Sequence, residues 1–251
     1  MAHVDYSGRM AEVYDAGRAL SAPALAMWTE AAARHLPADA GVVLDLGAGT
    51  GRFSSALAAR LGAAVVALEP AAGMRARAGA AAGDGVAVVG ARAEQLPFDA
   101  GTFGGVWASQ VLHHVPDLDA CAHELRRVLA PVGVVLVRGM LGDMATSWPL
   151  APYFPGAVTI VERRYPRLAE LGTRLGAAGL GVRAHERLAQ VTAAGPEDLA
   201  ARTALRADSA LALLPDDEFA AGLATLRRDV ERGRLSGPAV EVLDLVAFAP
   251  L

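Results

Sequence analysis

Three closely spaced glycines follow a short apolar run in the first third of the chain. Residues 42–46 read Val-Val-Leu-Asp-Leu and residues 47–51 read Gly-Ala-Gly-Thr-Gly, after which Phe53, Leu57 and Leu61 recur at helical spacing. This pattern predicts a strand, a tight turn and a helix. Glycine has no Cβ, so the backbone of such a turn can approach a ligand closely, and the helix N-terminus adds free N–H groups. Ligands of open α/β sheets bind at the carboxyl ends of the strands. We therefore interpret residues 47–51 as the floor of a binding site.

Strand-like and helical segments alternate along the remaining chain. Further strands are expected at residues 64–68, 86–89, 104–109, 134–138, 180–191 and 240–248. Helices are expected within residues 1–36, after residue 51, after residue 70, and at residues 117–129, 165–178 and 196–233, the last range holding two. The continuous apolar character of the strands suits a mostly parallel sheet that is covered on both faces. The sequence thus predicts the α/β class.

Two stretches break this alternation. Pro-Val-Gly at residues 131–133 is typical of a turn. Residues 140–163 contain Trp148, Tyr153 and Phe154 together with three prolines, and we expect them to form an irregular connection. A connection of this length is usually functional or disordered, and the aromatic side chains favour a functional one.

Composition and charge argue against several classes of function. The net charge of −4 gives no electrostatic reason to expect a nucleic-acid partner. No apolar run reaches the length of about 18 residues that a membrane helix needs, and the charged N-terminal segment lacks the apolar region of a signal peptide. Cys121 is the only cysteine, so an intrachain disulfide is impossible. We expect a cytoplasmic monomer or homodimer that has neither a metal site nor a membrane partner.

Four segments, taken in order, resemble the class I S-adenosylmethionine (SAM)-dependent methyltransferases that act on small molecules. Residues 44–51 are similar to the first motif of that family, and Glu69 to its acidic ribose ligand. Residues 93–98 (Ala-Glu-Gln-Leu-Pro-Phe) resemble the loop beside the adenine. Residues 109–115 (Ser-Gln-Val-Leu-His-His-Val) resemble the strand end that faces the methyl group. The resemblance covers about residues 42–138 well.

This resemblance implies that the chain has the family's fold, a doubly wound, mostly parallel seven-stranded sheet with an antiparallel last strand. A single domain is expected over residues 1–251, with a helical lid at residues 1–36 and a cofactor-binding core at residues 42–138. Substrate-side lid segments are expected at residues 139–165 and 193–237, the second as a helical insertion before the last strand.

The resemblance also implies SAM as the cofactor. Glu69 lies 18 residues after Gly51, and a carboxylate there can accept hydrogen bonds from both ribose hydroxyls, each worth about 1.5–3 kcal/mol. The resemblance implies that Met74 lies on a face of the adenine. It also implies that the backbone of Ala93 and Glu94 meets the adenine edge. The residues implied to bind SAM are Tyr14, Arg18, Asp45, Gly47, Ala48, Gly49, Gly51, Glu69, Pro70, Met74, Ala93, Glu94, Ser109, Gln110 and His114.

Two positions depart from the family pattern. Arg92 stands where the family often has an acidic residue that accepts from the adenine amino group, and arginine has no acceptor atom. Gly104 and Gly105 stand where an aspartate often precedes the fourth strand. These departures keep a SAM-fold protein that binds without catalysis as a competing interpretation. A nucleotide-cofactor oxidoreductase is another, although it does not account for residues 93–98 or 110–115.

The acceptor side has its own candidates. Histidine titrates near neutral pH, so His114 first and His113 second are the candidate catalytic bases if the acceptor must lose a proton. For either, a purely structural histidine is the alternative. The candidate substrate contacts are Tyr6, Trp148, Tyr153 and Phe154, with helix or core packing as the alternative for each. The predicted reaction transfers a methyl group from SAM to an O, N or C atom of a small molecule, hydrophobic or natural-product-like in character.

Overall fold

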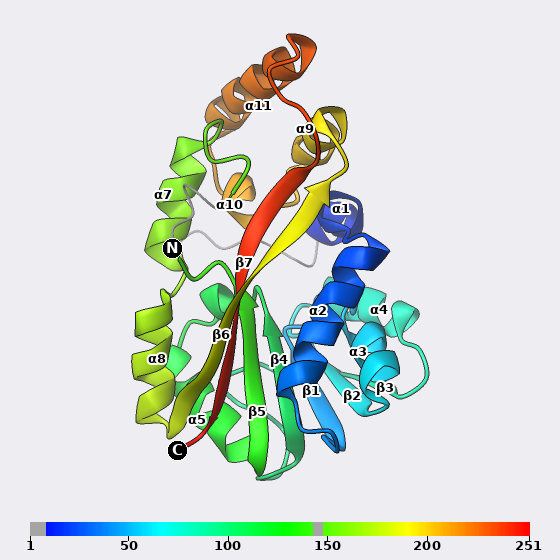
Figure 1. Ribbon diagram of the computed structural model, residues 1–251, viewed down its shortest axis with the longest axis vertical. Helices are drawn as coiled ribbons and strands as arrows, with labels where there is room; N and C mark the ends of the chain where they lie inside the picture. Colours follow the sequence, from blue (N-terminus) through cyan, green and yellow to red (C-terminus); the bar gives the residue numbers. More distant parts are fainter. Residues whose placement is uncertain (1–8, 143–147) are drawn as a thin grey trace. The chain divides into compact units, whose positions relative to one another are not determined.

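The computed structural model of the chain describes residues 9–142 and 148–251. Figure 1 shows helices and strands alternating along most of that length. The strands are β1 Val42–Leu46, β2 Ala64–Leu68, β3 Val86–Val89, β4 Phe103–Ser109, β5 Leu129–Gly139, β6 Leu180–Ala193 and β7 Ala239–Pro250. The helices are α1 Arg9–Arg18, α2 Ala22–His35, α3 Ser54–Leu61, α4 Ala72–Ala81, α5 Leu118–Val128, α7 Pro155–Arg164, α8 Leu168–Ala177, α9 Pro196–Ala204, α10 Ser209–Ala212 and α11 Asp216–Glu231, with a 3₁₀ turn η1 at Leu112–His114.

These strands form one mixed sheet in the order β3-β2-β1-β4-β5-β7-β6. Strands β1 to β5 pair in parallel, and β7 pairs antiparallel with β5, with Val137 opposite Val246. The predicted doubly wound sheet with an antiparallel last strand is therefore confirmed. The chain proceeds outward from β1 to β2 and β3, then returns to place β4 on the other side of β1. The order of strands thus reverses at the carboxyl ends of β1 and β4, which is where open α/β sheets bind ligands.

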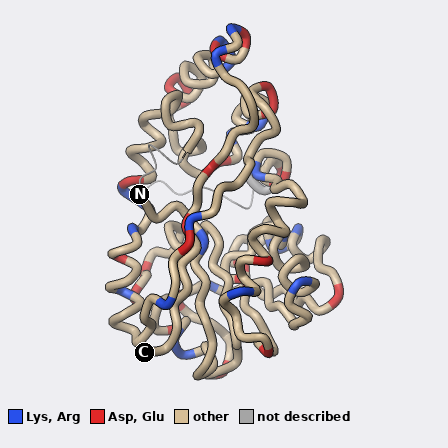
Figure 2. Tube along the Cα trace, in the orientation of Figure 1, with Lys and Arg blue, Asp and Glu red and all other residues tan. Residues whose placement is uncertain are grey.

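By their internal contacts the residues fall into two compact units. The sheet unit holds residues 25–142, 166–187 and 244–251, with β1 to β5 and helices α3, α4, α5 and α8. The helical unit gathers three segments far apart in the sequence, of which residues 9–24, 148–165 and 188–243 are described. In the helical unit α9 packs against α1 and α11, and α10 packs against α7. Figure 2 shows acidic and basic residues interspersed along the chain, with no long run of one sign.

The two faces of β1 are both buried, and they meet different partners in the sheet unit. Leu44 and Leu46 belong to a core that also contains Leu125 of α5 and Leu175 of α8. Neighbouring positions of a strand point to opposite faces, and Asp45 meets Ser54 at the start of α3. One face of β1 therefore builds the core, while the other carries a buried carboxyl group beneath the glycine turn.

Three expectations about elements were wrong. The predicted turn at residues 131–133 lies inside β5, where the pairing with β4 shifts register between Phe103 and Gly105. The predicted irregular connection contains α7, which begins with a proline at a position that does not need a backbone N–H. Residues 196–233 form three helices rather than two, because Asp208 caps the short α10 through the N–H of Ala210.

Candidate functional site

The glycine turn after β1 has one open position between two crowded ones. Gly47, Gly49 and Gly51 all have positive φ, at 66°, 61° and 80°. A Cβ on Gly47 would lie 2.2 Å from Cγ2 of Val111, and one on Gly51 would lie 3.2 Å from Ala78. A Cβ on Gly49 would meet no described atom within 4 Å. The turn is therefore held against its neighbours at both ends, while its centre leaves room for a ligand.

Glu69 connects the end of β2 to that open position. Its side chain is buried, and Oε2 accepts a hydrogen bond of 2.9 Å from the backbone N–H of Gly49, while Oε1 accepts one of 2.8 Å from Ala71. Burial raises the pKa of the carboxyl group, against the effect of these two bonds. Each carboxylate oxygen has more than one acceptor position. Glu69 can therefore hold the turn and still accept from a ligand's hydroxyl groups.

A second carboxyl group lies beneath the turn. Asp45 is 2% exposed and accepts a hydrogen bond of 2.6 Å from Oγ of Ser54. Burial raises its pKa to about 7, and the nearby Glu69 acts in the same direction. Ser54 was not among the predicted site residues, although its place in the first turn of the following helix could have suggested it. The pair joins β1 to α3 and so fixes the two ends of the glycine turn.

The predicted adenine loop is held by helix α5. The backbone N–H of Leu96 donates to Glu124 at 2.7 Å. Arg127 donates to the carbonyl oxygen of Leu96 at 2.9 Å and to that of Phe98 at 2.6 Å. Glu124 and Arg127 also pair with each other. These two residues were missed from the sequence, where their spacing indicates only a helical ion pair.

Arg92, the first departure from the family pattern, has an exposed side chain. It lies 3.5 Å from Glu94 and forms a short backbone bridge with Gln95. Ala93, between them, is buried. Met74 is buried within α4, and Pro70, two residues before this helix, is exposed. The roles predicted for these residues toward an adenine stay predictions.

The end of β4 has an unusual backbone conformation. Gln110 has φ of +53°, which is costly for a residue with a side chain, and its N–H donates to the carbonyl oxygen of Arg138 at 2.7 Å. The 3₁₀ turn that follows places the rings of His113 and His114 3.9 Å apart, centroid to centroid. Strained residues are often found at functional sites. The geometry makes these two histidines neighbours and leaves their predicted role open to experiment.

A buried arginine supports this strand end. Arg138 is 2% exposed and donates to Oγ of Ser109 at 2.9 Å. Its guanidinium lies over the rings of Trp28 and Phe53, at 4.4 and 5.4 Å from their centroids. Sequence reasoning missed this role, because Arg138 ends an apolar run in which a charge gives no sign of its partners. Cation–π contacts of this kind stabilise a charge removed from water.

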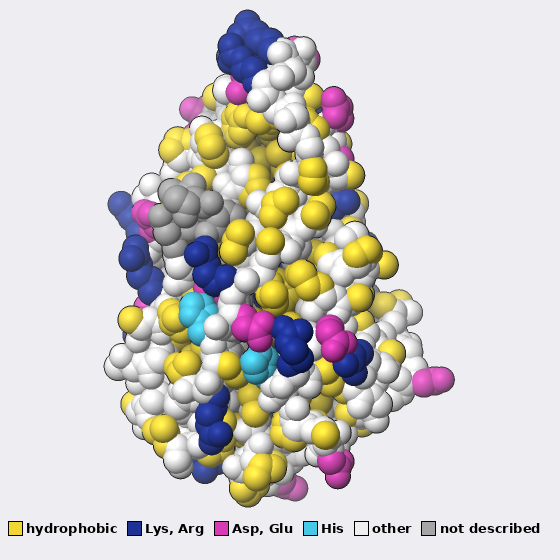
Figure 3. Space-filling view, viewed as in Figure 1, with side chains coloured by type: hydrophobic (Ala, Val, Ile, Leu, Met, Phe, Trp, Pro, Cys, Tyr) yellow, Lys and Arg dark blue, Asp and Glu magenta, His cyan; other side chains and the backbone are white. Residues whose placement is uncertain are grey.

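Two other histidines of the sheet unit, His35 and His185, each contact a carboxylate. His35 pairs with Glu186, which also binds Arg34. His185 lies 2.7 Å from Asp244. Figure 3 shows histidine, acidic and basic side chains side by side on the face in view.

Ala48, in the glycine turn, donates its backbone N–H to the carbonyl oxygen of Leu68 at 3.0 Å. Tyr6 is outside the described residues, and the predicted residues that follow lie in the helical unit. Arg18 binds Asp208 at 3.0 Å. Trp148 and Tyr153 line a cavity, and Tyr153 also donates to Asp229 at 3.3 Å. Phe154 is fully buried and stacks on Phe219, so core packing describes its surroundings. Tyr14 belongs to α1 and is within electrostatic range of Arg18.

Two kinds of feature are absent from the described residues, a metal-binding cluster and a membrane-spanning helix. They hold no group of three His, Cys, Asp or Glu side chains that could bind a metal ion. Within residues 9–142 and 148–251, no helix combines the length and apolar character needed to cross a membrane. Cys121 is buried, which raises the pKa of its thiol to about 12, as expected for a structural cysteine.

Comparisons with known proteins relate the central part of this chain to methyltransferases. Residues 44–137 match the family model of a methyltransferase domain. A demethylmenaquinone methyltransferase of Thermobifida fusca is 37% identical over 134 residues, which are 51% of this chain and 56% of that protein. The chain spans about half the length of the curated relatives it matches.

Solved structures show the same fold over more of the chain. One, from Anabaena variabilis, is assigned as a methyltransferase of an antibiotic biosynthesis pathway. It superposes with a TM-score of 0.68 at 23% sequence identity, and the match covers 90% of this chain and 97% of that protein. Another is the [4+2]-cyclase SpnF, which has a TM-score of 0.61 at 22% sequence identity. This match covers 94% of this chain and 84% of SpnF. At these identities the likeness concerns the fold.

Proposed function

Because this chain belongs to the class I SAM-dependent methyltransferases, we propose that it transfers a methyl group from SAM to a small, apolar acceptor. The observation that carries the proposal is the hydrogen bond of 2.9 Å between Gly49 and Glu69. It joins the open position of the glycine turn to an acidic group at the end of the neighbouring strand. A ligand with two adjacent hydroxyl groups and an extended chain fits such a pair.

Different residues of the sheet unit match different groups of SAM. Glu69 accepts from the ribose hydroxyls, and the turn at Gly49 leaves room for the backbone to approach the cofactor. The backbone of Ala93 and Glu94 meets the adenine edge in a loop that Glu124 and Arg127 hold in place. When bound, SAM supplies an electrophilic methyl group on its sulfonium.

The chain's own task is then to position an acceptor and to exclude water. A nucleophile at a near-attack distance of roughly 3–3.5 Å gains most of its rate from orientation. His114, with His113 beside it, is our candidate to take a proton from the acceptor where one must be lost. We assign recognition of the acceptor to the helical unit, whose cavity contains Trp148 and Tyr153.

Two observations support a small, apolar acceptor, the names of similar proteins and the lining of a cavity. The relative from Thermobifida fusca is named for a demethylmenaquinone, and the structural neighbour from Anabaena variabilis is assigned to antibiotic biosynthesis. Both names point to small molecules. The apolar lining of the helical unit's cavity favours an acceptor with an apolar body. We further propose that the protein acts in the cytoplasm as a monomer or homodimer.

One neighbour carries a different activity, which makes turnover the decisive measurement. SpnF is a [4+2]-cyclase on the same fold, and a fold by itself does not fix a reaction. Calorimetry with SAM and with NAD separates a methyltransferase from a nucleotide-cofactor oxidoreductase. Formation of S-adenosylhomocysteine across a panel of apolar acceptors separates it from a protein that only binds SAM. We expect SAM binding, no NAD binding, and turnover with apolar acceptors; turnover confined to highly polar acceptors would overturn the acceptor class.

A further inference from the structure

The helical unit contains a cavity of about 260 Å³ whose lining carries no charge. Three segments line it, namely the chain around Trp148 and Tyr153, the start of α9 at Pro196, and residues 235–240. Among the described lining residues the polar side-chain groups are two hydroxyls, of Tyr153 and Ser236, and the indole N–H of Trp148. Burying a charge without a partner is costly. This cavity therefore disfavours an ionised ligand of either sign.

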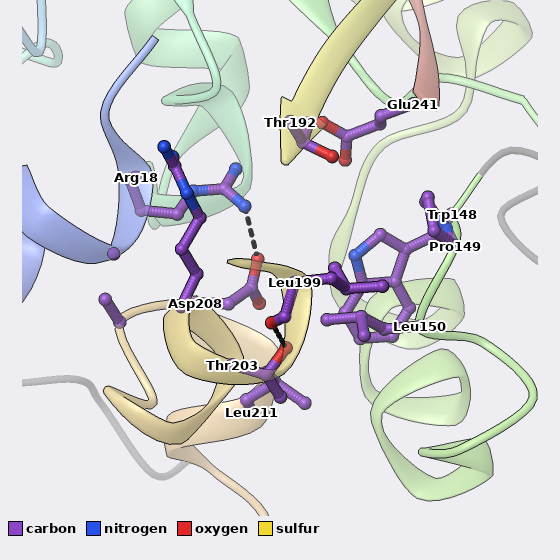
Figure 4. Close-up of a pocket in the computed structure, with 13 residues that line it drawn as sticks. Arg18, Trp148, Pro149, Leu150, Thr192, Leu199, Thr203, Asp208, Leu211 and Glu241 are labelled. Atoms are coloured by element: carbon purple, nitrogen blue, oxygen red, sulfur yellow. Dashed lines mark hydrogen bonds and ion pairs between the residues drawn. The ribbon is translucent and has the colours of Figure 1, made fainter. Parts of the chain in front are cut away.

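A smaller cavity of about 50 Å³ shares Trp148 with the larger one, and its charges balance. The charged residues of its lining are two arginines and two carboxylates, namely Arg18, Arg202, Asp208 and Glu241. Figure 4 shows Trp148 on the opposite side of this cavity from the ion pair of Arg18 with Asp208. Burial opposes the charge of Arg18, whereas Asp208 and Glu241 raise its pKa. Neither cavity therefore offers a net charge to a ligand.

The lining of the larger cavity is rigid as well as neutral. Pro149, Pro196 and Pro238 belong to it, together with the aromatic Trp148 and Tyr153. Proline has no side-chain rotamer freedom to lose, and an aromatic side chain has only two rotatable angles. Walls of this kind bind a rigid ligand with little loss of freedom on either side. Aromatic rings also gain from offset or edge contacts with each other. The lining therefore favours a flat ring system over a flexible chain.

Tyr153 is held in this lining by a carboxylate behind it. Its hydroxyl donates to Asp229 at 3.3 Å, and Asp229 pairs with Arg234 at 2.8 Å. The backbone N–H of Arg234 also donates to the carbonyl oxygen of Asp229 at 2.9 Å. Burial raises the pKa of Tyr153, and Asp229 raises it further, so the phenol keeps the proton that it donates. Because Arg234 leads directly into residues 235–240, Asp229 fixes two walls of the cavity at once.

We propose that the larger cavity binds an uncharged aromatic ring system, with Trp148 and Tyr153 as the recognising side chains and Asp229 as the positioning residue for Tyr153. The identification of this ring system as part of the methyl acceptor rests on the proposed function. A volume of about 260 Å³ lies just below the range of about 300–1,000 Å³ of small-molecule sites, which suits a compact ring system. Ser236 and Val240 line the cavity and are exposed, so a ligand can enter from the surface.

The test uses four probes with one bicyclic skeleton. Naphthalenemethanol is neutral and aromatic, and decahydronaphthalenemethanol is its saturated counterpart. Naphthoic acid is an anion at neutral pH, and naphthylmethylamine is a cation. Calorimetry on the full chain should give an affinity for the aromatic alcohol about fivefold above that for the saturated alcohol, as expected for aromatic contacts. Both ions should bind more weakly than the aromatic alcohol by roughly tenfold or more.

Variants assign the preference to named side chains. Trp148→Leu should abolish the preference for the aromatic over the saturated alcohol. Asp229→Ala should lower the affinity for the aromatic alcohol about threefold, near the net worth of one hydrogen bond. Asp229→Asn keeps an acceptor for Tyr153 and should restore most of that affinity, which a general loss of stability would not do. Phe219→Leu changes a half-buried aromatic residue of the same unit outside this cavity and should leave the preference unchanged.

Three results would overturn the proposal: equal binding of the two alcohols, tighter binding of either ion, or an equal loss of preference in Phe219→Leu. Should the variants fail to fold, the order of the four probes on the unaltered chain decides it. Absence of SAM binding would overturn the proposed function and leave the order of the probes unaffected. The two proposals can therefore fail separately.

Discussion

Glu69 acts at the scale of a single residue on both the shape of the site and its chemistry. Its carboxylate accepts from Gly49 and Ala71, so it holds the turn through hydrogen bonds within the protein. Under the proposed function it also accepts from the ribose. A carboxylate that is already oriented by the protein loses less freedom when the ligand binds.

We expect Glu69→Ala to weaken SAM binding at least tenfold, which corresponds to about 1.4 kcal/mol. The reason is the loss of both the ribose acceptor and the restraint on Gly49. Isothermal titration calorimetry measures the change. Asp84→Ala removes an exposed carboxylate from the same unit and serves as the control. An unchanged dissociation constant in Glu69→Ala would show that the ribose assignment is wrong.

Asp45 should make stability depend on pH. Its pKa is about 7 in the folded protein and about 3.9 in an unfolded chain, so the folded state holds a proton that the unfolded chain releases. The stabilisation is complete below about pH 4 and is lost as the pH rises to about 7. We expect Asp45→Asn to flatten this part of the profile, with Glu69 supplying the remainder. Urea unfolding across that range tests it, and two parallel profiles would contradict the assignment.

At the scale of elements, the glycine turn depends on its two neighbours. Gly47 is confined by Val111, which follows β4, whereas Gly49 faces open space. The same turn therefore contains one position that the fold confines and one that, under the proposed function, lies against the ligand. This division follows from packing and is invisible in the Gly-x-Gly spacing itself.

Alanine at these two glycines should have different effects. Gly49→Ala places a residue with a Cβ in the left-handed backbone conformation, which lowers stability by about 1–2 kcal/mol. We therefore expect a folded protein with weakened SAM binding. Gly47→Ala adds a clash at 2.2 Å, so we expect a clearly larger loss of stability. Thermal unfolding and calorimetry on both variants provide the measurement. Equal destabilisation would mean that Val111 yields to the added methyl group.

Helix α5 should control the adenine loop from outside the site. We expect Arg127→Ala to free the carbonyl oxygens of Leu96 and Phe98 and to weaken SAM binding about fivefold, near 1 kcal/mol. Hydrogen exchange in residues 93–98 should rise in parallel. Arg126→Ala, at the neighbouring position of the same helix, is the control. Faster exchange without any change in SAM affinity would separate the loop from the cofactor.

For the whole molecule, bound SAM should add stability that NAD does not. At a concentration of one hundred times its dissociation constant, a ligand specific for the folded state contributes about 2.7 kcal/mol. For a chain of this size that raises the Tm by about 5–10 °C. Differential scanning calorimetry with each ligand gives the comparison. A rise with NAD equal to that with SAM would favour the oxidoreductase interpretation.

The division into two units follows from contacts that no local pattern reveals. The helical unit joins segments that are far apart in the sequence, namely residues 9–24, 148–165 and 188–243. More than a hundred residues separate the first segment from the second. The ion pair of Arg18 with Asp208 links the first segment to the third. The sequence suggested that the same general regions serve the acceptor. It gave no indication that Arg18 and Glu241 line one cavity.

The sequence by itself determined the α/β class, the mostly parallel seven-stranded sheet implied by the resemblance, and the line of motifs from residue 44 to residue 115. These depend on short-range patterns: apolar runs, glycine at positions of positive φ, and an acidic residue at a strand end. Only the tertiary structure decided how Glu69 reaches Gly49, how Arg127 holds the loop of residues 93–98, and where the buried charges of Arg138 and Glu241 lie. The physical reason is that partners of buried polar groups are chosen by packing between distant segments, and a residue's type does not state which partner the fold will bring to it.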